Sequence, residues 1–491
     1  MKHSYEDCGT RGGDEAPRQR MGNANVKTKL IAVAVVSLSL GFAANSVAQN
    51  QITSITLTNG QVVISWNCRG TLETANQVNG PWTPVPGATS PYVDQISATQ
   101  RFYHINQTVD TTSLFNKVLC GYQGWFRCPG DGGNQWIHWS RSTSTIASNT
   151  LTVDMWPDMT EYTTAEQYIA PGFTYPGDAQ AYLFSAQNQQ TVNRHFNWML
   201  QYGIDGVYVQ RFITDITGRP WMTNVLNYAR AAANQTGRTF ALEYDMSGAD
   251  TNTLFSRMTN DWTWLVNTVG LTQDPRYLHH NGKPVLAIFG FYPSRFTNNP
   301  ALPQQIITWF ESNPVQSVTL IGSGEWWWRT DTSAGWSNIF RSFNAYIPWN
   351  TGNYSTVGTD EYATTSYWEA DLAEATRVGM LYLPQIYPGF SWDNLMQLPP
   401  GTSKIPRLGG NFLWQQFYAV ANLGLNMAFV GMFDEVDEGT AIFKVTNTPP
   451  TQGYFVTYDG LPTDWYLRLT DAGAQMLSGA IPTTPTIPIS P

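Results

Sequence analysis

The stretch Met427-Ala428-Phe429-Val430-Gly431-Met432-Phe433-Asp434-Glu435-Val436-Asp437-Glu438-Gly439-Thr440 joins a short apolar run to four carboxylates that fall within five positions. A continuous apolar run of this length is typical of a strand that is buried on both faces, as in a parallel sheet. Polar residues that directly follow such a strand stand at the C-terminal edge of the sheet, where α/β proteins place their sites. The stretch therefore predicts a parallel α/β fold with an acidic site at one strand end.

Seven further apolar segments precede this one, and the eight candidate strands are 117–125, 206–212, 239–244, 284–289, 317–321, 344–348, 380–386 and 427–433. Between them lie segments whose apolar residues recur three or four positions apart, as in helices: 193–200, 224–233, 302–311, 369–378 and 412–423. Alternating strands and helices imply a parallel sheet, and eight is the number of strands in the closed (β/α)8 fold. We therefore predict a TIM barrel over residues 112–478, with long inserted loops.

The alternative architecture is an open, doubly wound sheet. That fold commonly carries a glycine-rich G-x-G-x-x-G turn after its first strand, where the bare backbone holds a phosphate. Here the corresponding stretch is Gly121-Tyr122-Gln123-Gly124-Trp125, with bulky aromatic residues in those positions. The closed barrel is the better interpretation.

Residues 49–108 have a different pattern, with short alternating strands and frequent turn residues. Segments 52–57 and 61–66 flank Thr58-Asn59-Gly60, which carries an Asn-Gly hairpin signal, and a last strand covers 101–105. We predict a small all-β sandwich module in front of the α/β barrel. It has an accessory role, either carbohydrate binding or spacing, and spacing is favoured because no group of site-like residues converges in it.

Both ends of the chain carry processing or linker signals. Lys27 and Lys29 precede the apolar run 30–44, and Ser46-Val47-Ala48 offers small residues of the kind that a signal peptidase reads. Residues 1–48 therefore predict a signal peptide region, with Met21 as an alternative start, and a secreted or periplasmic protein. The apolar run is too short for a membrane span. The Pro/Thr-rich tail 479–491 predicts an unfolded segment or the remnant of a linker.

Three cysteines follow the predicted leader, at Cys68, Cys120 and Cys128. An oxidising compartment permits a Cys120–Cys128 disulfide, but strand residues that point into a barrel do not easily reach a neighbouring loop. Three buried thiols are slightly favoured. Neither the cysteines nor the six histidines have zinc-site spacing, so we expect no metal.

The composition restricts the class of ligand. Charged residues make up only 13% of the chain, 14% of the residues are aromatic, and the net charge is −9. No Lys/Arg cluster lies in the folded part, which argues against nucleic acid and an anionic membrane surface as partners. A neutral, hydroxyl-rich ligand stays open. We expect a monomer.

The acidic stretch has a chemical interpretation. Crowded carboxylates raise at least one pKa, so that one acid stays protonated beside another that is ionised. Glycosidic bond cleavage needs such a pair. The alternatives are a solvated acidic turn or a calcium loop, but the position at the end of a barrel strand favours a site.

Aromatic and polar residues follow several of the other strands and would share the same rim. Sugar rings present flat C–H faces to aromatic side chains and hydroxyls to polar ones, so a rim lined in this way suits an oligosaccharide. The alternative is that many of these aromatic residues belong to the core, and that Arg211 forms a structural ion pair. The candidate substrate-binding residues are Tyr122, Trp125, Trp156, Arg211, Tyr244, Asp245, Trp326 and Tyr387.

Other catalytic classes lack their motifs. The sequence contains no G-x-S-x-G nucleophile turn, no phosphate-binding Walker loop and no Cys/His pair placed by a motif. We therefore expect no cofactor.

The acidic stretch also resembles a known signature. Residues 433–440 are similar to the E-x-x-E-G-T motif of the endo-α-mannosidases, glycoside hydrolase family 99, and their relatives near family 71. Gly121-Tyr122-Gln123-Gly124-Trp125, Asp154-Met155-Trp156-Pro157-Asp158 and Gly203-Ile204-Asp205-Gly206-Val207 look like the bacterial branch often labelled xylosidase/arabinosidase. The resemblance covers most of residues 114–470.

This resemblance implies a (β/α)8 retaining enzyme. In the family, the first glutamate deprotonates the sugar 2-hydroxyl to form a 1,2-anhydro intermediate, and the second protonates the leaving oxygen. By position, Glu435 would be the base and Glu438 the acid/base. The chain departs from the mannosidases at Val436 and Asp437, where they have a Trp and a His.

The leading hypothesis is thus a secreted retaining glycosidase that acts on an α-linked polysaccharide or oligosaccharide through Glu435 and Glu438. The second hypothesis is a non-catalytic carbohydrate-binding protein on a barrel scaffold. The third is a calcium-dependent adhesion protein that uses the acidic turn.

Overall fold

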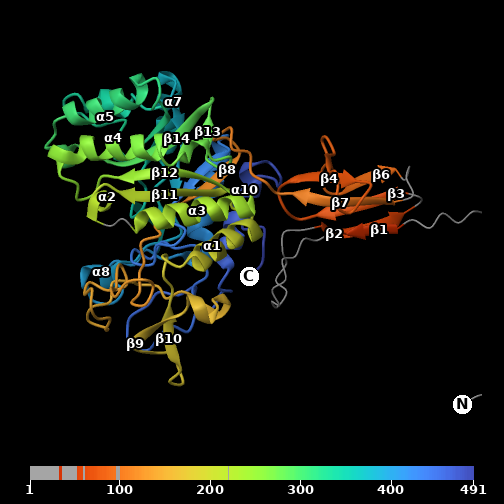
Figure 1. Cartoon of the computed structure of the whole chain (residues 1–491), viewed down its shortest axis with the longest axis horizontal. Coiled ribbons are helices and arrows are strands. Elements are labelled where there is room, and N and C mark those ends of the chain that lie inside the picture. Colours follow the sequence, from red (N-terminus) through yellow and green to blue (C-terminus); the bar gives the residue numbers. More distant parts are fainter. Residues whose placement is uncertain (1–31, 36–51, 59–60, 96–99, 219–220) are drawn as a thin grey trace, which may run out of the picture.

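The computed structural model describes residues 32–35, 52–58, 61–95, 100–218 and 221–491. They form two parts, a small β module and a larger α/β barrel, which lie side by side along the long axis of the molecule (Figure 1).

The β module is a sandwich of two sheets, as predicted. One sheet has the strand order β1 (Ala32–Val35), β7 (Gln100–Asn106), β4 (Thr71–Ala75) and β5 (Thr83–Pro84), and the other has the order β2 (Ile52–Thr58), β3 (Gln61–Trp66) and β6 (Tyr92–Gln95). Val62, Ile64, Leu72 and Tyr103 form the core between them. The Asn59-Gly60 turn lies outside the described residues. Of the predicted signal region, only strand β1 is described, and it pairs in parallel with β7.

One ion pair links the module to the barrel. The Arg69 guanidinium donates to an Asp205 carboxylate oxygen 2.9 Å away and to the Gly203 carbonyl. The same Asp205 oxygen accepts the backbone N–H of Val118 at 2.8 Å. Since Asp205 and Val118 lie at the N-terminal ends of barrel strands, the module is attached at that end of the barrel.

The barrel contains all eight predicted strands, and its neighbouring strands are parallel. In spatial order they are β8 (Lys117–Tyr122), β11 (Gly206–Phe212), β12 (Thr239–Asp245), β14 (Lys283–Phe291), β15 (Thr319–Gly324), β16 (Ala345–Pro348), β19 (Leu381–Tyr382) with β20 (Gln385–Ile386), and β21 (Met427–Val430). The predicted seventh strand, 380–386, is interrupted at Leu383 and Pro384. Its first half pairs with β16 and its second half with β21, while β21 pairs with β8, so the sheet closes.

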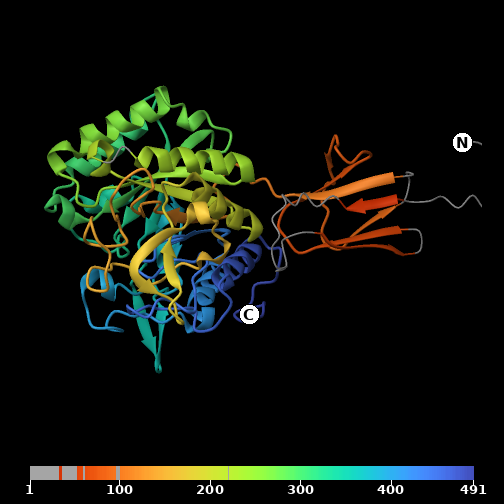
Figure 2. The same cartoon turned by 60° about the horizontal axis from the view of Figure 1, so that its bottom comes forward.

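Helices surround the sheet on its outer side (Figure 2). They are α1 (Gln189–Gln201), α2 (Asp215–Gly218), α3 (Met222–Thr236), α4 (Thr251–Asn267), α5 (Ala301–Ser312), α6 (Trp336–Phe340), α7 (Trp368–Val378), α8 (Asp393–Met396), α9 (Asn411–Asn422) and α10 (Trp465–Leu477). The five predicted helices of the barrel correspond to α1, α3, α5, α7 and α9. The sequence patterns did not predict α4, whose apolar residues are interspersed with Thr and Asn.

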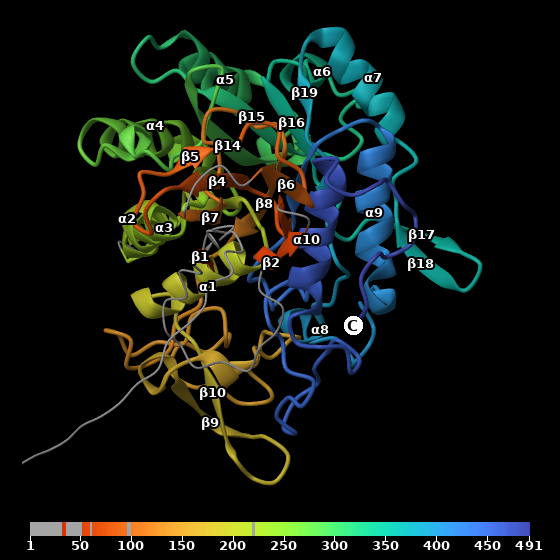
Figure 3. The same cartoon turned by 90° about the vertical axis from the view of Figure 1, so that its right-hand side faces the viewer.

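Short elements decorate the loops. Hairpins are formed by β9 (Tyr168–Thr174) with β10 (Gln180–Leu183) and by β17 (Tyr354–Val357) with β18 (Asp360–Ala363), and β13 (His279–His280) pairs with β14. The β17–β18 hairpin projects from the edge of the barrel (Figure 3). Single 3₁₀ turns cover Met159–Glu161, Thr164–Glu166, Leu271–Gln273, Pro293–Phe296 and Leu408–Gly410.

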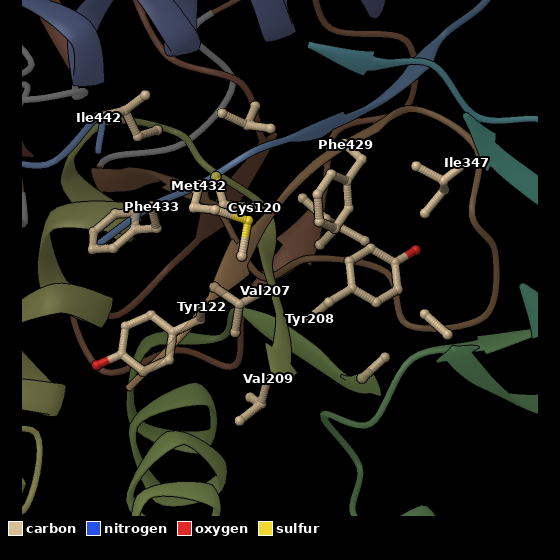
Figure 4. Close-up of a cluster of buried hydrophobic side chains, with 14 of the residues drawn as sticks. Cys120, Tyr122, Val207, Tyr208, Val209, Ile347, Phe429, Met432, Phe433 and Ile442 are labelled. Atoms are coloured by element: carbon tan, nitrogen blue, oxygen red, sulfur yellow. The ribbon is translucent and has the colours of Figure 1, made fainter. Parts of the chain in front are cut away.

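Side chains along the strands alternate between the barrel interior and the helices. In the interior, the Tyr208 ring lies beside the Phe429 ring, with centroids 5.5 Å apart, whereas Tyr122 points away from them (Figure 4). A Cβ on Gly121 would come within 3.0 Å of the Phe429 ring, so this inward position of β8 has no room for a larger residue. Neighbouring strand positions therefore have different surroundings.

The C-terminal tail is ordered against the barrel, contrary to our expectation. The backbone carbonyls of Thr484 and Pro485 accept hydrogen bonds from Trp414 and Gln415 of α9, and Ile487 packs on the barrel core. The tail has apolar side chains among its prolines, and these give it a surface to bury.

The three described cysteines, Cys68, Cys120 and Cys128, are buried free thiols, as favoured from the sequence. Burial raises the pKa of the Cys68 thiol to about 12.

Candidate functional site

The acidic turn, residues 434–440, follows β21 at the C-terminal end of the barrel and is anchored to the first strand. The Asp434 carboxylate accepts the backbone N–H groups of Gln123 at 2.8 Å and Gly124 at 2.9 Å. Burial nevertheless raises the pKa of Asp434 to about 7. Asp434 therefore connects the turn to the loop after β8, and both of its oxygens are used by the protein.

A second part of the loop after β8 and the loop after β20 hold the backbone of the acidic turn. The Val436 carbonyl accepts the N–H of Asp154 at 2.9 Å, and the Glu438 carbonyl accepts the N–H of Ser391 at 2.9 Å. Gly439 has φ +62°, and a Cβ there would lie 2.8 Å from the Ser391 backbone nitrogen, so only glycine fits this close approach. The backbone that carries Glu435 and Glu438 is thus fixed by loops that follow the first and seventh strands.

Glu435 and Glu438 lie in a strongly acidic environment. Burial, followed by the charges of Glu438 and Asp437, raises the pKa of Glu435 well above its usual value, and a hydrogen bond from the Gln123 side chain lowers it in part. Burial, followed by the charges of Asp437 and Asp245, raises the pKa of Glu438 to about 7. At neutral pH the pair therefore holds a proton, which is the condition for one acid and one base to act together.

Asp245, at the end of β12, belongs to the same group of carboxylates because its charge acts on Glu438. It accepts hydrogen bonds from the Gln210 side chain at 2.5 Å and from the Ser247 N–H at 2.6 Å. Two positions earlier, Glu243 lies inside the barrel, where burial and the charge of Asp245 raise its pKa to about 8. Carboxyl groups inside the barrel thus continue from Asp245, at the end of β12, to Glu243, two positions earlier in the same strand.

Glu325 and Trp326 follow β15. Burial, and then the charge of Asp331, raises the pKa of Glu325 to about 7. The Trp326 ring is half-buried and lies 5.0 Å from the Tyr367 ring and 5.2 Å from the Trp327 ring, measured between centroids. Trp327 is 45% exposed. Trp326 and Trp327 therefore have ring surface that a ligand could contact.

Trp125 is half-buried, but both His138 and Phe212 stack on its ring. The centroids of Trp125 and His138 are 3.8 Å apart with an interplanar angle of 5°, and those of Trp125 and Phe212 are 5.3 Å apart. The His138 Nδ1 atom lies 3.5 Å from an oxygen of Asp437, the residue that precedes Glu438 in the sequence. Trp125 therefore contacts the acidic turn through His138, and its ring is not an open stacking face.

Three of the predicted substrate-binding residues face the helices instead. Tyr122 is fully buried, and its hydroxyl is 3.0 Å from Nδ1 of His195 in α1. Arg211 donates twice to Asp261 of α4, at 2.6 and 2.7 Å, and the Tyr244 hydroxyl donates to the same carboxylate at 2.6 Å. The prediction is wrong for these residues, because the alternation of the strands turns them outward, and Arg211 forms the structural ion pair that was its alternative.

Trp156 and Tyr387 are also core residues, with no exposed surface. The Trp156 indole N–H is within hydrogen-bonding distance of the Tyr182 carbonyl, at 3.1 Å. The Tyr387 hydroxyl donates to the Asn353 carbonyl at 2.9 Å, and its ring packs edge-on against Phe412. Neither ring has a free face for a sugar, which corrects the prediction for both.

The inward residues that the sequence interpretation missed are the immediate neighbours of those that it chose. Gln123 follows Tyr122, Gln210 precedes Arg211, and Glu243 precedes Tyr244. A polar side chain inside an otherwise apolar strand was the available signal, because an amide or carboxyl is rarely buried without a purpose.

Many buried polar atoms without a hydrogen-bond partner gather at this end of the barrel. A native protein leaves few such atoms, so a concentration of them marks a place where a polar ligand or water completes the hydrogen bonding. Within the described residues, the atoms that belong to the ends of barrel strands or the loops directly after them are Gln123 Oε1, Trp125 Nε1, Gln210 Oε1, both Glu243 oxygens, Ser323 Oγ, Glu325 Oε2, Asn350 Nδ2, Thr351 Oγ1, Gln385 Nε2 and Asp437 Oδ1.

The described residues lack two further kinds of feature. They contain no group of three or more His, Cys, Asp or Glu side chains that is placed to hold a metal ion. In the same part of the chain, no helix has the length and apolar character needed to cross a membrane.

Among the comparisons with known proteins, only the comparison with solved structures found similar proteins. No protein-family description matches the sequence, and no curated protein does. Two solved structures of the GH99 endo-alpha-mannosidase from Bacteroides thetaiotaomicron, one of them in complex with bis-tris-propane, match over 75% of this chain and 99% of theirs. The sequence identity is 16% and the TM-scores are 0.54 and 0.55. At this identity the likeness establishes the fold: the chain is built like the endo-α-mannosidase of glycoside hydrolase family 99.

Proposed function

We propose that the protein is a secreted retaining glycoside hydrolase that cleaves an α-linked polysaccharide or oligosaccharide with Glu435 and Glu438. The fold is that of a glycosidase, and the two glutamates stand at the barrel end where enzymes of this fold carry their active sites. Secretion rests on the apolar leader and its cleavage signal within residues 1–48.

The observation that carries this proposal is the state of the glutamate pair. Both carboxyl groups have raised pKa values, that of Glu438 to about 7, while their backbone is held by the loops after the first and seventh strands. A protonated acid beside a group that can accept a proton, on a rigid support, is what glycosidic cleavage requires. An acidic turn that only contacted solvent would not bury these groups.

The resemblance of residues 433–440 to the family 99 motif implies the roles of the two glutamates. In the first step, Glu435 takes the proton of the sugar 2-hydroxyl, O2 attacks C1, and the C1–O bond to the leaving group breaks as Glu438 gives its proton to the leaving oxygen. In the second step, Glu438 takes a proton from water, the water oxygen attacks C1, the C1–O2 bond breaks, and Glu435 returns its proton to O2. Two displacements at C1 retain the configuration.

The charges around the pair favour a neutral substrate. The charge of Asp437 acts on both Glu435 and Glu438, and that of Asp245 acts on Glu438. A carboxylate or sulfate on the substrate would be repelled there, because like charges in a desolvated site interact strongly. Unmodified α-mannans are therefore the first substrates to test, because their 2-hydroxyl lies trans to the leaving oxygen and can attack C1 from the opposite face. α-Glucans, whose 2-hydroxyl is cis, and xylans, whose backbone is β-linked, complete the screen as comparisons.

The experiment is a screen of the purified protein on these polysaccharides, with product analysis, followed by Glu435→Gln and Glu438→Gln on the cleaved substrate. Each change keeps the shape but removes the proton transfer, so turnover should fall by about 10³-fold. Glu369→Gln, on the exposed face of α7, is the matched control and should retain full turnover. NMR of the first-formed anomer should give retention.

Two results would count against this function. If either glutamine variant kept full turnover, the assigned pair would be wrong. If the parent protein bound the saccharides without cleaving them, and binding survived the loss of Glu435, the non-catalytic carbohydrate-binding hypothesis would replace it.

A further inference from the structure

Two buried carboxamides lie at neighbouring strand ends beside the acidic turn. Asn350 follows β16 and has no exposed surface, and Gln385 begins β20 and is 1% exposed. Neither is charged, neither belongs to the glutamate pair, and the sequence interpretation singled out neither. Each has one half of its amide engaged and the other half free.

The orientation of Gln385 is fixed by the backbone. Its Oε1 accepts the N–H groups of both Asn350 and Thr351, the latter at 2.9 Å. An oxygen that already accepts two backbone hydrogens leaves the Nε2 amide as the other end, and this donor has no partner among the described residues. Gln385 thus presents a free donor whose direction cannot be reversed without losing two hydrogen bonds.

Asn350 repeats this arrangement. Its Oδ1 accepts the Tyr367 hydroxyl at 2.7 Å and the Asn353 amide at 3.1 Å, which leaves Nδ2 as a buried donor without a partner in the described chain. The Thr351 hydroxyl is likewise buried and unpaired. Three uncharged polar groups therefore lack a hydrogen-bond partner within the described chain: the Asn350 and Gln385 amide nitrogens, which can only donate, and the Thr351 hydroxyl.

This region adjoins the strand that leads to the catalytic glutamates. A Cβ on Gly431 would come within 2.5 Å of Gln385 Nε2 and 3.2 Å of Thr351 Oγ1, so both atoms lie against the β21 backbone. Gly431 precedes Glu435 by four positions. The free donors are thus on the β16–β20 side of the acidic turn, and the carboxylates Asp245 and Glu243 both come from β12, across the barrel order.

Free amide N–H groups require acceptor oxygens, and buried ones that stay unpaired are costly. A sugar hydroxyl can accept from one group while it donates to another, so the same ring can satisfy these donors on one side and the carboxylates on the other. We infer that Asn350, Thr351 and Gln385 form a subsite that binds hydrogen-bond-accepting oxygens of an uncharged sugar. This inference rests on the proposed function, since it assigns the substrate contacts of the same site.

The test exchanges donor for acceptor at constant shape. In Gln385→Glu and Asn350→Asp, the oxygen that the protein uses stays in place, while the free NH₂ becomes an oxygen. We expect KM to rise by about tenfold in each variant, with a smaller change in kcat, because one hydrogen bond to substrate is replaced by a repulsive contact. Lowering the pH should reduce the KM defect relative to the parent, because a protonated carboxyl regains a donor.

Gln416→Glu is the matched control. Gln416 is another buried amide, but its Nε2 donates to the carbonyls of Tyr387 and Phe412 and its Oε1 accepts the Tyr387 N–H. This change should lower the melting temperature without raising KM. If all three variants changed stability alike and none changed KM, Asn350 and Gln385 would be structural residues and the inference would fail.

A binding arm separates this inference from the proposed function. In the Glu438→Gln background, calorimetric titration with α-mannotetraose and maltotetraose should give weaker binding when Gln385→Glu is added, and α-tetragalacturonate should bind less than either neutral sugar. Binding without turnover in the parent would overturn the function but leave the subsite supported. Equal binding with and without Gln385→Glu, stronger binding of the uronate, or no binding of any of these sugars would overturn the subsite.

Discussion

Buried carboxylates on the two sides of the barrel sheet have opposite surroundings. On the helix side, Asp261 is paired with both arms of Arg211 and with the Tyr244 hydroxyl, and Glu166 receives two hydrogen bonds from Arg194 and two from Thr163. On the interior side, Glu243 has no hydrogen-bond partner among the described residues. The outer acids depend on partners whose removal would leave a buried charge, whereas burial without a partner raises the pKa of the inner acid Glu243.

The largest contrast should come from neutralising an inner acid of the proposed pair. Glu435→Gln removes a buried carboxyl that is repelled by its neighbours, so the variant should lose about 10³-fold in turnover while its stability is equal to or higher than that of the parent. Turnover assays and urea unfolding on the same preparation measure both. A large loss of stability would mean that Glu435 belongs with the outer, structural acids.

The matching change on the outer side is Asp261→Asn. It breaks the bidentate pair with Arg211 and leaves a buried guanidinium without its charge partner, so the free energy of unfolding should fall by about 3–5 kcal/mol. The kcat of the protein that remains folded should stay close to that of the parent. If kcat fell while stability held, Arg211 would act in catalysis after all.

The pH dependence of stability tests the comparison at the inner acid Glu243. Burial raises its pKa from 4.5 to about 8, so the folded protein binds this proton more tightly than the unfolded chain does. Its favourable contribution is complete below about pH 4.5 and is lost as the pH rises through about 8, at up to about 1.4 kcal/mol per pH unit. Unfolding free energies at several pH values should therefore have a shallower decline in Glu243→Gln. An unchanged slope would place the titration elsewhere.

The smallest expected effect is that of Tyr122→Phe. The change removes a hydroxyl that contacts His195 on the helix side, so it should cost about 1 kcal/mol of stability. KM should not change, because the ring has no exposed surface. A clear rise in KM would restore Tyr122 to the substrate-binding residues.

Much of the fold could be predicted from the sequence because buried parallel strands leave a strong apolar signal. The strand Gly206–Phe212 was predicted with the bounds that the structure has, and the split seventh strand was located as one segment. Helix α4 was missed because polar Thr259 and Asp261 occupy buried positions while Trp264 is exposed, which disturbs the apolar spacing. The tail was misjudged because composition does not reveal that Ile487 has a surface to pack on.

The candidate site was predicted less evenly. The charge of Asp245 acts on Glu438, so the ends of β12 and β21 bring these two carboxyl groups to the same end of the barrel, and the catalytic roles of Glu435 and Glu438 stay predictions. For Tyr122, Arg211 and Tyr244 the prediction was wrong by one position. The apolar pattern locates a strand that is buried on both faces, but it does not tell which alternate residues face the barrel interior. The contacts of Asn350 and Gln385 join segments that are far apart in the sequence, so no local sequence pattern predicts them.

The ion pair between Arg69 and Asp205 determines how the two parts of the protein can cooperate. It fixes the β module at the N-terminal ends of the strands, whereas the acidic turn follows their C-terminal ends. A strand such as Gly206–Phe212, with seven residues at about 3.3 Å each, separates these ends by roughly 20 Å. A single sugar unit cannot touch both, so the ion pair keeps the module away from any ligand that lies against the acidic turn.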